Sequence, residues 1–447
     1  MRAHHTQAKA PARARPALRA LPLALFLAGL PGITLADEAR EAALEARVAQ
    51  LEQLVQQLVT QQQAAQQAAA EEAAKPKAPA IQSTPIIPSN PDTRFSYGGF
   101  IKLDAMLTDT SDGEIADGSA ARTLYVPGAI PVGGPDEGTD LDMHAQFSRF
   151  WFAADTELDS GDKLRGYLEF DLFGGALGSE AATNTYGVTI RHAYASWNKW
   201  LVGQTWSNFQ DVGALPDSVD FVGPTDGTTF SRQAQIRYTN GPWSFAFENP
   251  ETLVGTPGRV SSDDNTIPDL TLRYTGKYAS GHFSVAGILR ELSYENVATG
   301  VDDSIFGYGV SLSGKHAFNA DNDLRYMLTG GRGISRYIGL ATANDAYLDD
   351  TGDLDDVGTL AGFVAWRHVI SPQLRSNLYY AAAHYDNDTD FSGLGATKRV
   401  HSLSGNLIWT VLPKLDIGVE LRLANRELES GADGDLRRLQ LHAKYSF

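Results

Sequence analysis

Apolar and polar residues alternate along most of the chain. Between residues 163 and 172, Leu164 and Leu168 face one side of an extended chain, while Arg165 and Glu169 face the other. Successive side chains of a β-strand point to opposite faces, so this period of two indicates strands with one apolar and one polar face. About sixteen such segments follow one another, which predicts an all-β fold. The clearest further examples lie at residues 95–108, 415–423 and 439–447.

The segments that connect these strands alternate between short turns and long loops. Strand alternation alone does not separate a soluble sandwich from a membrane barrel, because the apolar faces meet a second sheet in one and lipid in the other. Tight turns at one end and long loops at the other are the plan of outer-membrane barrels. The sequence therefore predicts a 16-stranded antiparallel transmembrane β-barrel over residues 94–447. The short turns include Asn198-Lys199, Ser280-Gly281 and Leu412-Pro413, and the long loops span residues 109–142, 207–231, 251–267 and 334–356.

Residues 1–36 have the layout of a secretory signal peptide. A basic N-terminus precedes an apolar run over residues 21–35, and the small residue Ala36 follows it. That order of basic, apolar and small residues predicts cleavage after export. The alternative is a single transmembrane anchor, but the run is short for a membrane span and contains Pro22 and Pro31. The basic residues are Arg2, Lys9, Arg13, Arg15 and Arg19.

Residues 37–74 are predicted to form a periplasmic coiled-coil helix. Apolar residues recur there at alternating spacings of four and three, which is the seam of a coiled coil. The seam lasts only about three heptads, so the alternative is an isolated amphipathic or partly disordered spacer. Residues 75–93 contain several prolines and are predicted to form an extended linker to the barrel. The seam positions are Leu44, Val48, Leu51, Val55 and Leu58.

Composition excludes several classes of chemistry. The chain has no cysteine, so it has neither disulfides nor thiolate metal sites. Its formal net charge of -17 argues against nucleic-acid binding. We find no hydrolase, metalloprotease, phosphate-loop or dinucleotide motif, and we expect neither enzymatic activity, catalytic residues nor a cofactor. The spacing of Asp386, Asp388 and Asp390 begins like a calcium loop, but Phe391 and Thr397 occupy key positions. We therefore predict no metal site.

Five sequence motifs occur in the first half of the predicted barrel. They are Tyr97-Gly98-Gly99-Phe100-Ile101-Lys102-Leu103-Asp104-Ala105-Met106, Tyr125-Val126-Pro127-Gly128-Ala129-Ile130-Pro131-Val132-Gly133-Gly134, Gln146-Phe147-Ser148-Arg149-Phe150, Leu201-Val202-Gly203-Gln204-Thr205-Trp206 and Arg232-Gln233-Ala234-Gln235-Ile236-Arg237-Tyr238. These motifs resemble those of the DcaP-like trimeric outer-membrane channels, whereas the second half of the barrel matches in pattern only. The resemblance implies a homotrimer of sixteen-stranded channels with a periplasmic helical extension, which takes up small organic anions such as dicarboxylates.

Basic side chains recur on the polar faces of the predicted strands. A planar guanidinium matches a carboxylate, and a ring of such groups lowers the barrier for anions in a narrow lumen. The alternative is a ladder of cross-strand ion pairs that stiffens the wall. We favour Arg165, Arg191 and Arg237 for permeation, because the closest carboxylate on their own faces is the more distant Glu169. The recurring basic residues are Lys102, Arg149, Arg165, Arg191, Arg237, Arg273, Arg290, Arg375 and Arg422, and the first seven of them are the candidate pore-lining residues.

The predicted loop over residues 207–231 is both acidic and aromatic, with four aspartates and three phenylalanines. Its phenylalanines favour packing into the lumen, yet an acidic inward loop would oppose anion flow. We predict an outer-membrane porin that prefers small organic anions. Two alternatives remain: a channel for neutral or cationic solutes such as sugars, and a non-conducting tether between the outer membrane and peptidoglycan. The expected partners are outer-membrane lipid, lipopolysaccharide and further copies of this chain.

Overall fold

A computed structural model describes residues 92–136, 138–175, 183–256 and 258–447, together with Gln53, Gln56, Gln57 and Thr60. Those four isolated residues are helical, and the Thr60 hydroxyl donates a hydrogen bond to the Gln56 carbonyl at 2.8 Å. The signal peptide, the seam of the coiled coil and nearly all of the linker lie outside the described residues, and they stay predictions. Among the described helices, none has both the length and the apolar character of a membrane span.

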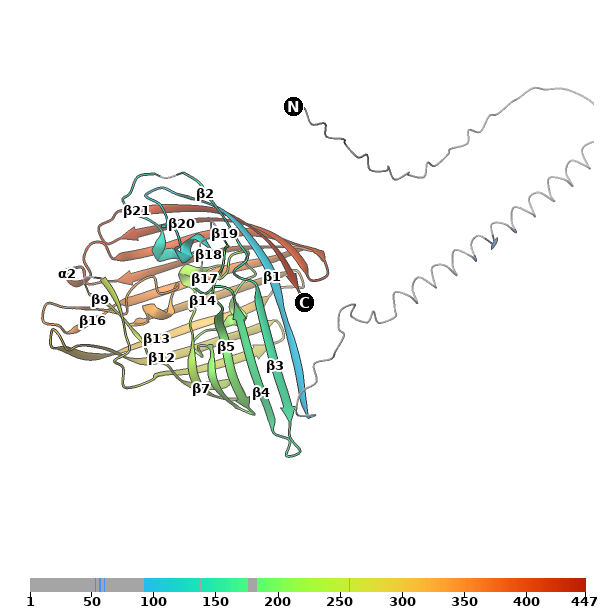
Figure 1. Ribbon diagram of the computed structural model, residues 1–447, viewed down its shortest axis with the longest axis horizontal. Coiled ribbons are helices and arrows are strands. Elements are labelled where there is room, and N and C mark those ends of the chain that lie inside the picture. Colours follow the sequence, from blue (N-terminus) through green and yellow to red (C-terminus); the bar gives the residue numbers. More distant parts are fainter. Residues whose placement is uncertain are drawn as a thin grey trace, which may run out of the picture. The chain divides into compact units, whose positions relative to one another are not determined.

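In the described part of the chain, sixteen antiparallel strands close into a barrel, as predicted (Figure 1). β1 closes it by pairing with β3 on one side and β21 on the other. The strands are β1 (Thr93–Thr110), β3 (Arg149–Glu157), β4 (Lys163–Asp171), β5 (Thr189–Trp197), β6 (Trp200–Trp206), β7 (Arg232–Asn240), β8 (Trp243–Glu248), β11 (Asp269–Tyr278), β12 (Gly281–Asn296), β13 (Val301–Ala317), β14 (Asn322–Arg332), β17 (Gly358–Ser371), β18 (Leu374–Asp386), β19 (Thr397–Leu412), β20 (Leu415–Leu428) and β21 (Asp433–Ser446).

A further strand, β2 (Asp140–His144), pairs with the same neighbour in the barrel wall as β3 does, namely β1. It pairs with residues 104–108 of β1, whereas β3 pairs with residues 93–100 of the same strand. β2 and β3 are therefore two pieces of one barrel strand, interrupted at residues 145–148. This interruption explains why the described sheet contains seventeen strands while the barrel has sixteen positions.

Tight turns, most of them of two residues, join strands at one end of the barrel, which we call the turn end. Asn198 and Gly241 take positive φ angles of 51° and 60° there, a conformation that Asn and Gly tolerate in tight hairpins. The opposite, loop end carries most of the long connections. Residues 297–300 and 429–432 are exceptions, because tight turns join the long strand pairs β12–β13 and β20–β21 at the loop end.

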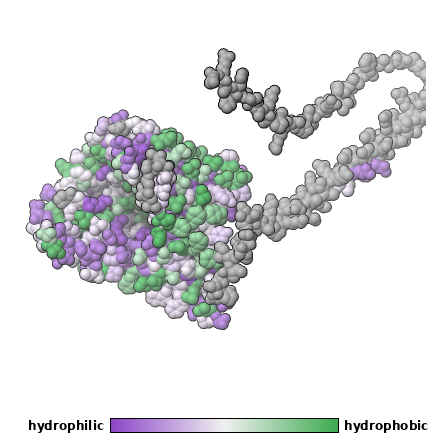
Figure 2. Space-filling model, viewed as in Figure 1, coloured by the Kyte–Doolittle hydropathy of each residue, from purple (hydrophilic) through white to green (hydrophobic). Residues whose placement is uncertain are grey.

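The outer face of the wall is apolar. Its aromatic side chains gather near the turn end, which is typical of a membrane interface. Figure 2 shows hydrophilic residues gathered on the side where α2, β9 and β16 lie in Figure 1, and hydrophobic residues over the wall. The exposed aromatic residues close to the turns include Trp197, Trp200, Trp243, Tyr278, Trp409 and Tyr445.

Wall height differs around the barrel. β3, β4 and β5 have 9 residues each and β6 only 7, whereas β12 and β13 have 16 and 17. We call β3–β8 the short wall and β12–β21 the long wall. Two loops at the loop end build a small second sheet from β9 (Thr252–Thr256), β10 (Gly258–Ser262), β15 (Ala346–Leu348) and β16 (Leu354–Asp356). The short helices are η1 (Ala120–Arg122), η2 (Pro127–Ala129), η3 (Val212–Ala214), η4 (Thr225–Gly227), η5 (Ser335–Tyr337) and α2 (Thr389–Ser392).

Candidate permeation site

Residues 207–231, which we call the inner loop, fold into the barrel. The loop leaves β6 and passes β8, where the Asn208 amide donates to Glu248 at 2.7 Å. Further along, the Val219 amide donates to Glu420 of β20 at 3.0 Å. On its return the loop packs against β17, where a Cβ on Gly227 would stand 1.9 Å from the Gly362 carbonyl oxygen. Only glycine fits such a close approach of two backbones.

The first two carboxylates of the inner loop pair with basic side chains of the wall. Asp211 Oδ2 lies 2.8 Å from His282 Nε2. Asp217 Oδ2 lies 3.2 Å from Arg367 Nε and 3.2 Å from Arg375 Nε. The wall thus supplies an imidazole to Asp211 and two guanidinium groups to Asp217, at the points where the loop brings these carboxylates into the lumen.

The other two carboxylates, Asp220 and Asp226, accept hydrogen bonds from Tyr125 and from Ser402 of β19. Asp220 accepts from the Tyr125 backbone amide at 2.9 Å. Asp226 accepts from the Tyr125 hydroxyl at 2.7 Å and also from the Ser402 hydroxyl. Burial raises the pKa of the Asp226 carboxyl. The acidic residues of the inner loop are therefore partnered, and they fix the loop in place.

Basic groups outnumber carboxylates on the long wall beside this loop. Asp323 of β14 is approached by Lys315 Nζ at 3.6 Å, Arg325 Nε at 2.8 Å and Arg367 Nη1 at 3.4 Å. Three cations around one carboxylate leave net positive charge, which a passing anion can neutralise.

The same network continues onto β18, β20 and β21. Arg375 joins Asp217 to Asp416, whose Oδ2 lies 3.1 Å from Arg375 Nη2 and 3.9 Å from Lys444 Nζ. We call this set the inner cation belt, in which five basic groups share three carboxylates. A cavity of about 260 Å³ beside the inner loop is lined by Asp217, Phe221, Arg375 and Lys444, among others. The belt consists of Lys315, Arg325, Arg367, Arg375 and Lys444 with Asp217, Asp323 and Asp416.

A second basic group lies on the short wall. The register of β4 and β5 shifts between Glu169 and Phe170, so Arg191 is an extra residue at a β-bulge. A bulge can re-aim a side chain, and the Arg191 guanidinium reaches Glu169 and Asp171 at 2.9 Å each. Arg149 lies farther from the same two carboxylates, at 3.6 and 3.9 Å.

Arg232 adds a third cation to this short-wall cluster. Its guanidinium lies 4.8 Å from the centre of the Trp206 ring and 5.7 Å from that of Phe230. Among the described residues no carboxylate lies within 4.0 Å of it, and its buried Nη1 has no hydrogen-bond partner. The short-wall cluster, formed by Arg149, Arg191, Arg232, Glu169 and Asp171, therefore holds three cations and two carboxylates.

The inner loop connects the two groups of cations. Phe221 lines the cavity beside Arg375 and Lys444. The same ring lies 5.9 Å from the Arg149 guanidinium and 5.2 Å from that of Arg191. A solute at Phe221 would thus be within reach of positive charge from both walls.

The remaining predicted pore residues divide into partnered and unpartnered ones. Lys102 is buried and binds Asp104 at 2.8 Å and the Val219 carbonyl at 2.7 Å. Arg165 pairs with Asp155 at 3.0 Å. The preference for Arg165 and Arg191 considered only carboxylates on their own strands. In the structure β3 supplies a carboxylate to Arg165, and β4 supplies two to Arg191.

Arg237 and Arg273 carry the least compensated charge among the predicted residues. Their guanidiniums donate to the carbonyls of Trp206 and Gln210, respectively. Within the described ranges no carboxylate oxygen lies within 4.0 Å of either one. Neutral acceptors hold these side chains in place without cancelling their charge.

Arg290 belongs to a different kind of cluster, which we call the buried quartet. Its Nη1 lies 3.0 Å from Asp345, and its Nε lies 3.4 Å from Asp269. Arg336 completes the set at 3.1 Å from Asp269. The side chains of Arg290, Asp269 and Asp345 are 0% exposed. This balanced set attaches the loop at residues 333–357 to the wall and leaves no charge for a solute.

The sequence analysis missed Arg232 and four of the five belt cations as site residues. Alternation does place Lys315 on the same face as the buried Ser311 and Ser313, which is a usable signal. No pattern on a single strand shows that Lys315, Arg325 and Arg367 converge on Asp323. That convergence depends on the register of three neighbouring strands.

A closed sixteen-stranded barrel with an inward loop and a charged lumen defines a porin of the outer membrane. The chain belongs to the DcaP outer membrane protein family, whose model matches residues 33–447.

Solved structures agree with this fold. The outer membrane channel DcaP of Acinetobacter baumannii matches with a TM-score of 0.68 and 24% identity, covering 80% of this chain and 99% of that one. An anion-selective porin from Comamonas acidovorans matches with a TM-score of 0.49 and 12% identity, covering 79% and 100%. Outer-membrane expressed OmpT of Vibrio cholerae matches with a TM-score of 0.49 and 11% identity, covering 81% and 100%. The agreement in fold rests on the first of these three structures alone. Among curated proteins, no sequence matches this chain.

Proposed function

We propose that this porin is a diffusion channel that prefers small organic anions such as dicarboxylates. The supporting observation is the balance of charge at the inner loop. The loop's four carboxylates have wall or loop partners, and the belt around Asp217 still holds five basic groups for three carboxylates. The acidic inward loop, which would otherwise favour cations, is thus outweighed by the wall that receives it.

The two basic groups favour a solute with two negative ends. The inner cation belt and the short-wall cluster both border Phe221. Guanidinium groups bind carboxylates through paired hydrogen bonds, and the Phe221 ring offers an apolar surface for the carbon chain between them. We expect Lys102, Arg191 and Arg290, which are buried and paired with carboxylates, to hold the structure. We expect Arg149, Arg237 and Arg273 to contact solutes.

Solute flux into liposomes tests this proposal. We expect succinate to enter faster than an uncharged sugar of similar size through the wild-type channel. The double substitution Arg375→Gln, Lys444→Gln should remove most of this difference. Arg437→Gln is a matched control, because Arg437 is exposed on the opposite face of β21 from the buried Arg438. Equal flux of both solutes through the wild type would favour the channel for neutral solutes.

We also propose that the channel is a homotrimer with its N-terminal extension in the periplasm. The family resemblance supports the trimer, and the coiled-coil seam supports a helical extension. Sedimentation in detergent would give the mass of three chains, and a single-chain mass would contradict it. Deleting residues 37–92 should leave the conductance of the channel intact. If the protein is instead a non-conducting tether between the outer membrane and peptidoglycan, the intact protein does not conduct and the deletion impairs the envelope.

A further inference from the structure

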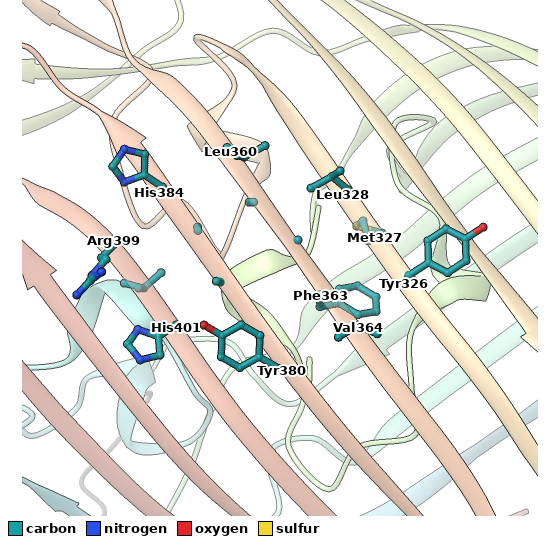
Figure 3. A pocket seen from close by; sticks show the side chains of 15 residues that line it. Tyr326, Met327, Leu328, Leu360, Phe363, Val364, Tyr380, His384, Arg399 and His401 are labelled. Atoms are coloured by element: carbon teal, nitrogen blue, oxygen red, sulfur yellow. The ribbon is translucent and has the colours of Figure 1, made fainter.

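A groove of about 780 Å³ crosses the outer, lipid-facing surface of β14, β17, β18 and β19 (Figure 3). Its centre is hollow because small residues lie there between larger side chains. Gly362 pairs with Leu328 on one side and Ala382 on the other. A Cβ on Gly362 would stand 2.6 Å from the Met327 carbonyl oxygen, so the strands themselves require this glycine.

Large apolar side chains border the groove. Leu328, Leu360, Val364 and Tyr380 are between 45% and 57% exposed on the outer face. Together with the short side chain of Ala382, they leave a channel against the wall that a hydrocarbon chain can fill. Inside the membrane no water is displaced, so an acyl chain would gain from van der Waals packing in a groove that fits its shape.

The loop end of the groove is basic. His384 lies two residues before β18 ends, and Arg399 and His401 lie near the start of β19 (Figure 3). Arg399 Nε contacts Glu427 at 2.6 Å, and Lys398 Nζ lies 3.6 Å from the same carboxylate. Two cations therefore share one carboxylate. We call His384, Lys398, Arg399 and His401 the basic lip.

Carboxylates also border the basic lip. Asp386, the next outward residue after His384, is 75% exposed and lies 3.7 Å from Arg332, whose Nε pairs with Asp356 at 2.5 Å. The Arg399 side chain remains 56% exposed despite its contact with Glu427. An exposed guanidinium at the headgroup level of a membrane is placed to bind a lipid phosphate.

A second groove on the same outer surface provides a comparison. It has a volume of about 430 Å³ and is lined by Trp243, Leu272, Tyr274, Val285 and Gly287. None of these lining residues is charged. The two grooves therefore share an apolar floor, and only the first has positive charge at its loop end.

We propose that the first groove binds lipopolysaccharide, with an acyl chain along Gly362 and Ala382 and a phosphate at the basic lip. The lip lies at the loop end, which faces the outer leaflet, where phosphorylated glycolipid is the main lipid. This site is independent of the lumen, so it does not rest on the anion preference proposed above.

Native mass spectrometry of the purified wild type with defined rough-type lipopolysaccharide tests the site. Ala382→Phe fills the groove, and Arg399→Gln removes a cation from the lip. Each should weaken binding about tenfold, which is the usual loss for one charge-assisted hydrogen bond or a comparable packed contact. Gly287→Phe is the matched control, because a Cβ there meets only the Gly309 carbonyl oxygen at 4.0 Å. It should leave binding unchanged.

Several outcomes would overturn the proposal. Equal lipopolysaccharide binding by all variants would show that the groove is not the site. Equal binding of phosphatidylglycerol and lipopolysaccharide by the wild type would refute selectivity for the glycolipid. A change in oligomeric mass caused by Ala382→Phe would show that another copy of the chain covers the groove. Each variant is first shown to be folded by its unchanged conductance and its heat-modifiable mobility on gels.

Discussion

The buried quartet and the inner cation belt are both built from arginines and aspartates inside one barrel, yet they differ in balance and exposure. In the quartet, Arg290 and Arg336 meet two carboxylates, and Arg290 is fully buried. In the belt, five basic groups share three carboxylates, and their side chains remain 12–34% exposed. The first arrangement holds a loop in place, whereas the second leaves charge for a solute.

This difference shows that an inward arginine is not by itself a permeation residue. Desolvating a guanidinium is costly, so a buried one needs full compensation by carboxylates and carbonyls. A solvated one can remain partly uncompensated, and its field then acts on ions in the lumen. Charge balance together with exposure separates the two roles, and the substitutions below test that separation.

The largest effect is expected for Arg290→Met. Removing this guanidinium leaves Asp269 and Asp345 buried with only Arg336 nearby, and breaking such a buried network costs about 3–5 kcal/mol. Denaturant unfolding in detergent micelles, followed by tryptophan fluorescence, would measure the loss. The ion selectivity of molecules that remain folded should stay that of the wild type. A stable variant with altered selectivity would contradict the structural role.

The double substitution Arg375→Gln, Lys444→Gln should change ion selectivity and leave stability almost unchanged. We expect stability close to that of the wild type, because both side chains are partly exposed. The permeability ratio of chloride to potassium should fall about fivefold, since two charges in a solvated lumen contribute on the order of 1 kcal/mol after screening. Single-channel recordings in a salt gradient would show it. An unchanged ratio would remove the belt from the permeation path.

A smaller change is expected for Arg232→Gln in the short-wall cluster. Arg149 and Arg191 remain there, so we expect about a twofold fall in anion preference from the loss of one screened charge. Arg232→Lys keeps the charge but stacks less well on Trp206, and it should restore most of the preference. The same recordings serve for both variants. If the lysine variant behaves like the glutamine variant, stacking rather than charge is responsible.

The smallest effect is expected for Asp226→Asn. Burial raises the pKa of this carboxyl, so it takes up a proton at higher pH than an ordinary aspartate and carries less negative charge as pH falls. The amide oxygen can still accept one of the two hydrogen bonds, from Tyr125 or Ser402. Selectivity measured across a pH series should match the wild type. A marked gain in anion preference would show that Asp226 is a free charge in the lumen.

Much of the barrel could be predicted from sequence, because strand alternation and turn chemistry are local properties. The pattern at residues 163–172 corresponds to β4, and Asn198 and Gly241 mark tight turns. The ion-pair partners of the lumen residues could not be predicted from the sequence in the same way. Arg191 faces Glu169 and Asp171 only because a bulge inserts it into the register. Asp217 meets Arg367 and Arg375 across 150 or more residues, which no local pattern encodes.

The zero-current potential of the wild-type channel in a potassium chloride gradient tests the central claim most directly. Uncompensated cations around the inner loop predict stepwise conductance and a potential of the sign that chloride permeation produces. A potential of the potassium sign would show instead that the aspartates of the inner loop control the lumen, and it would contradict the account.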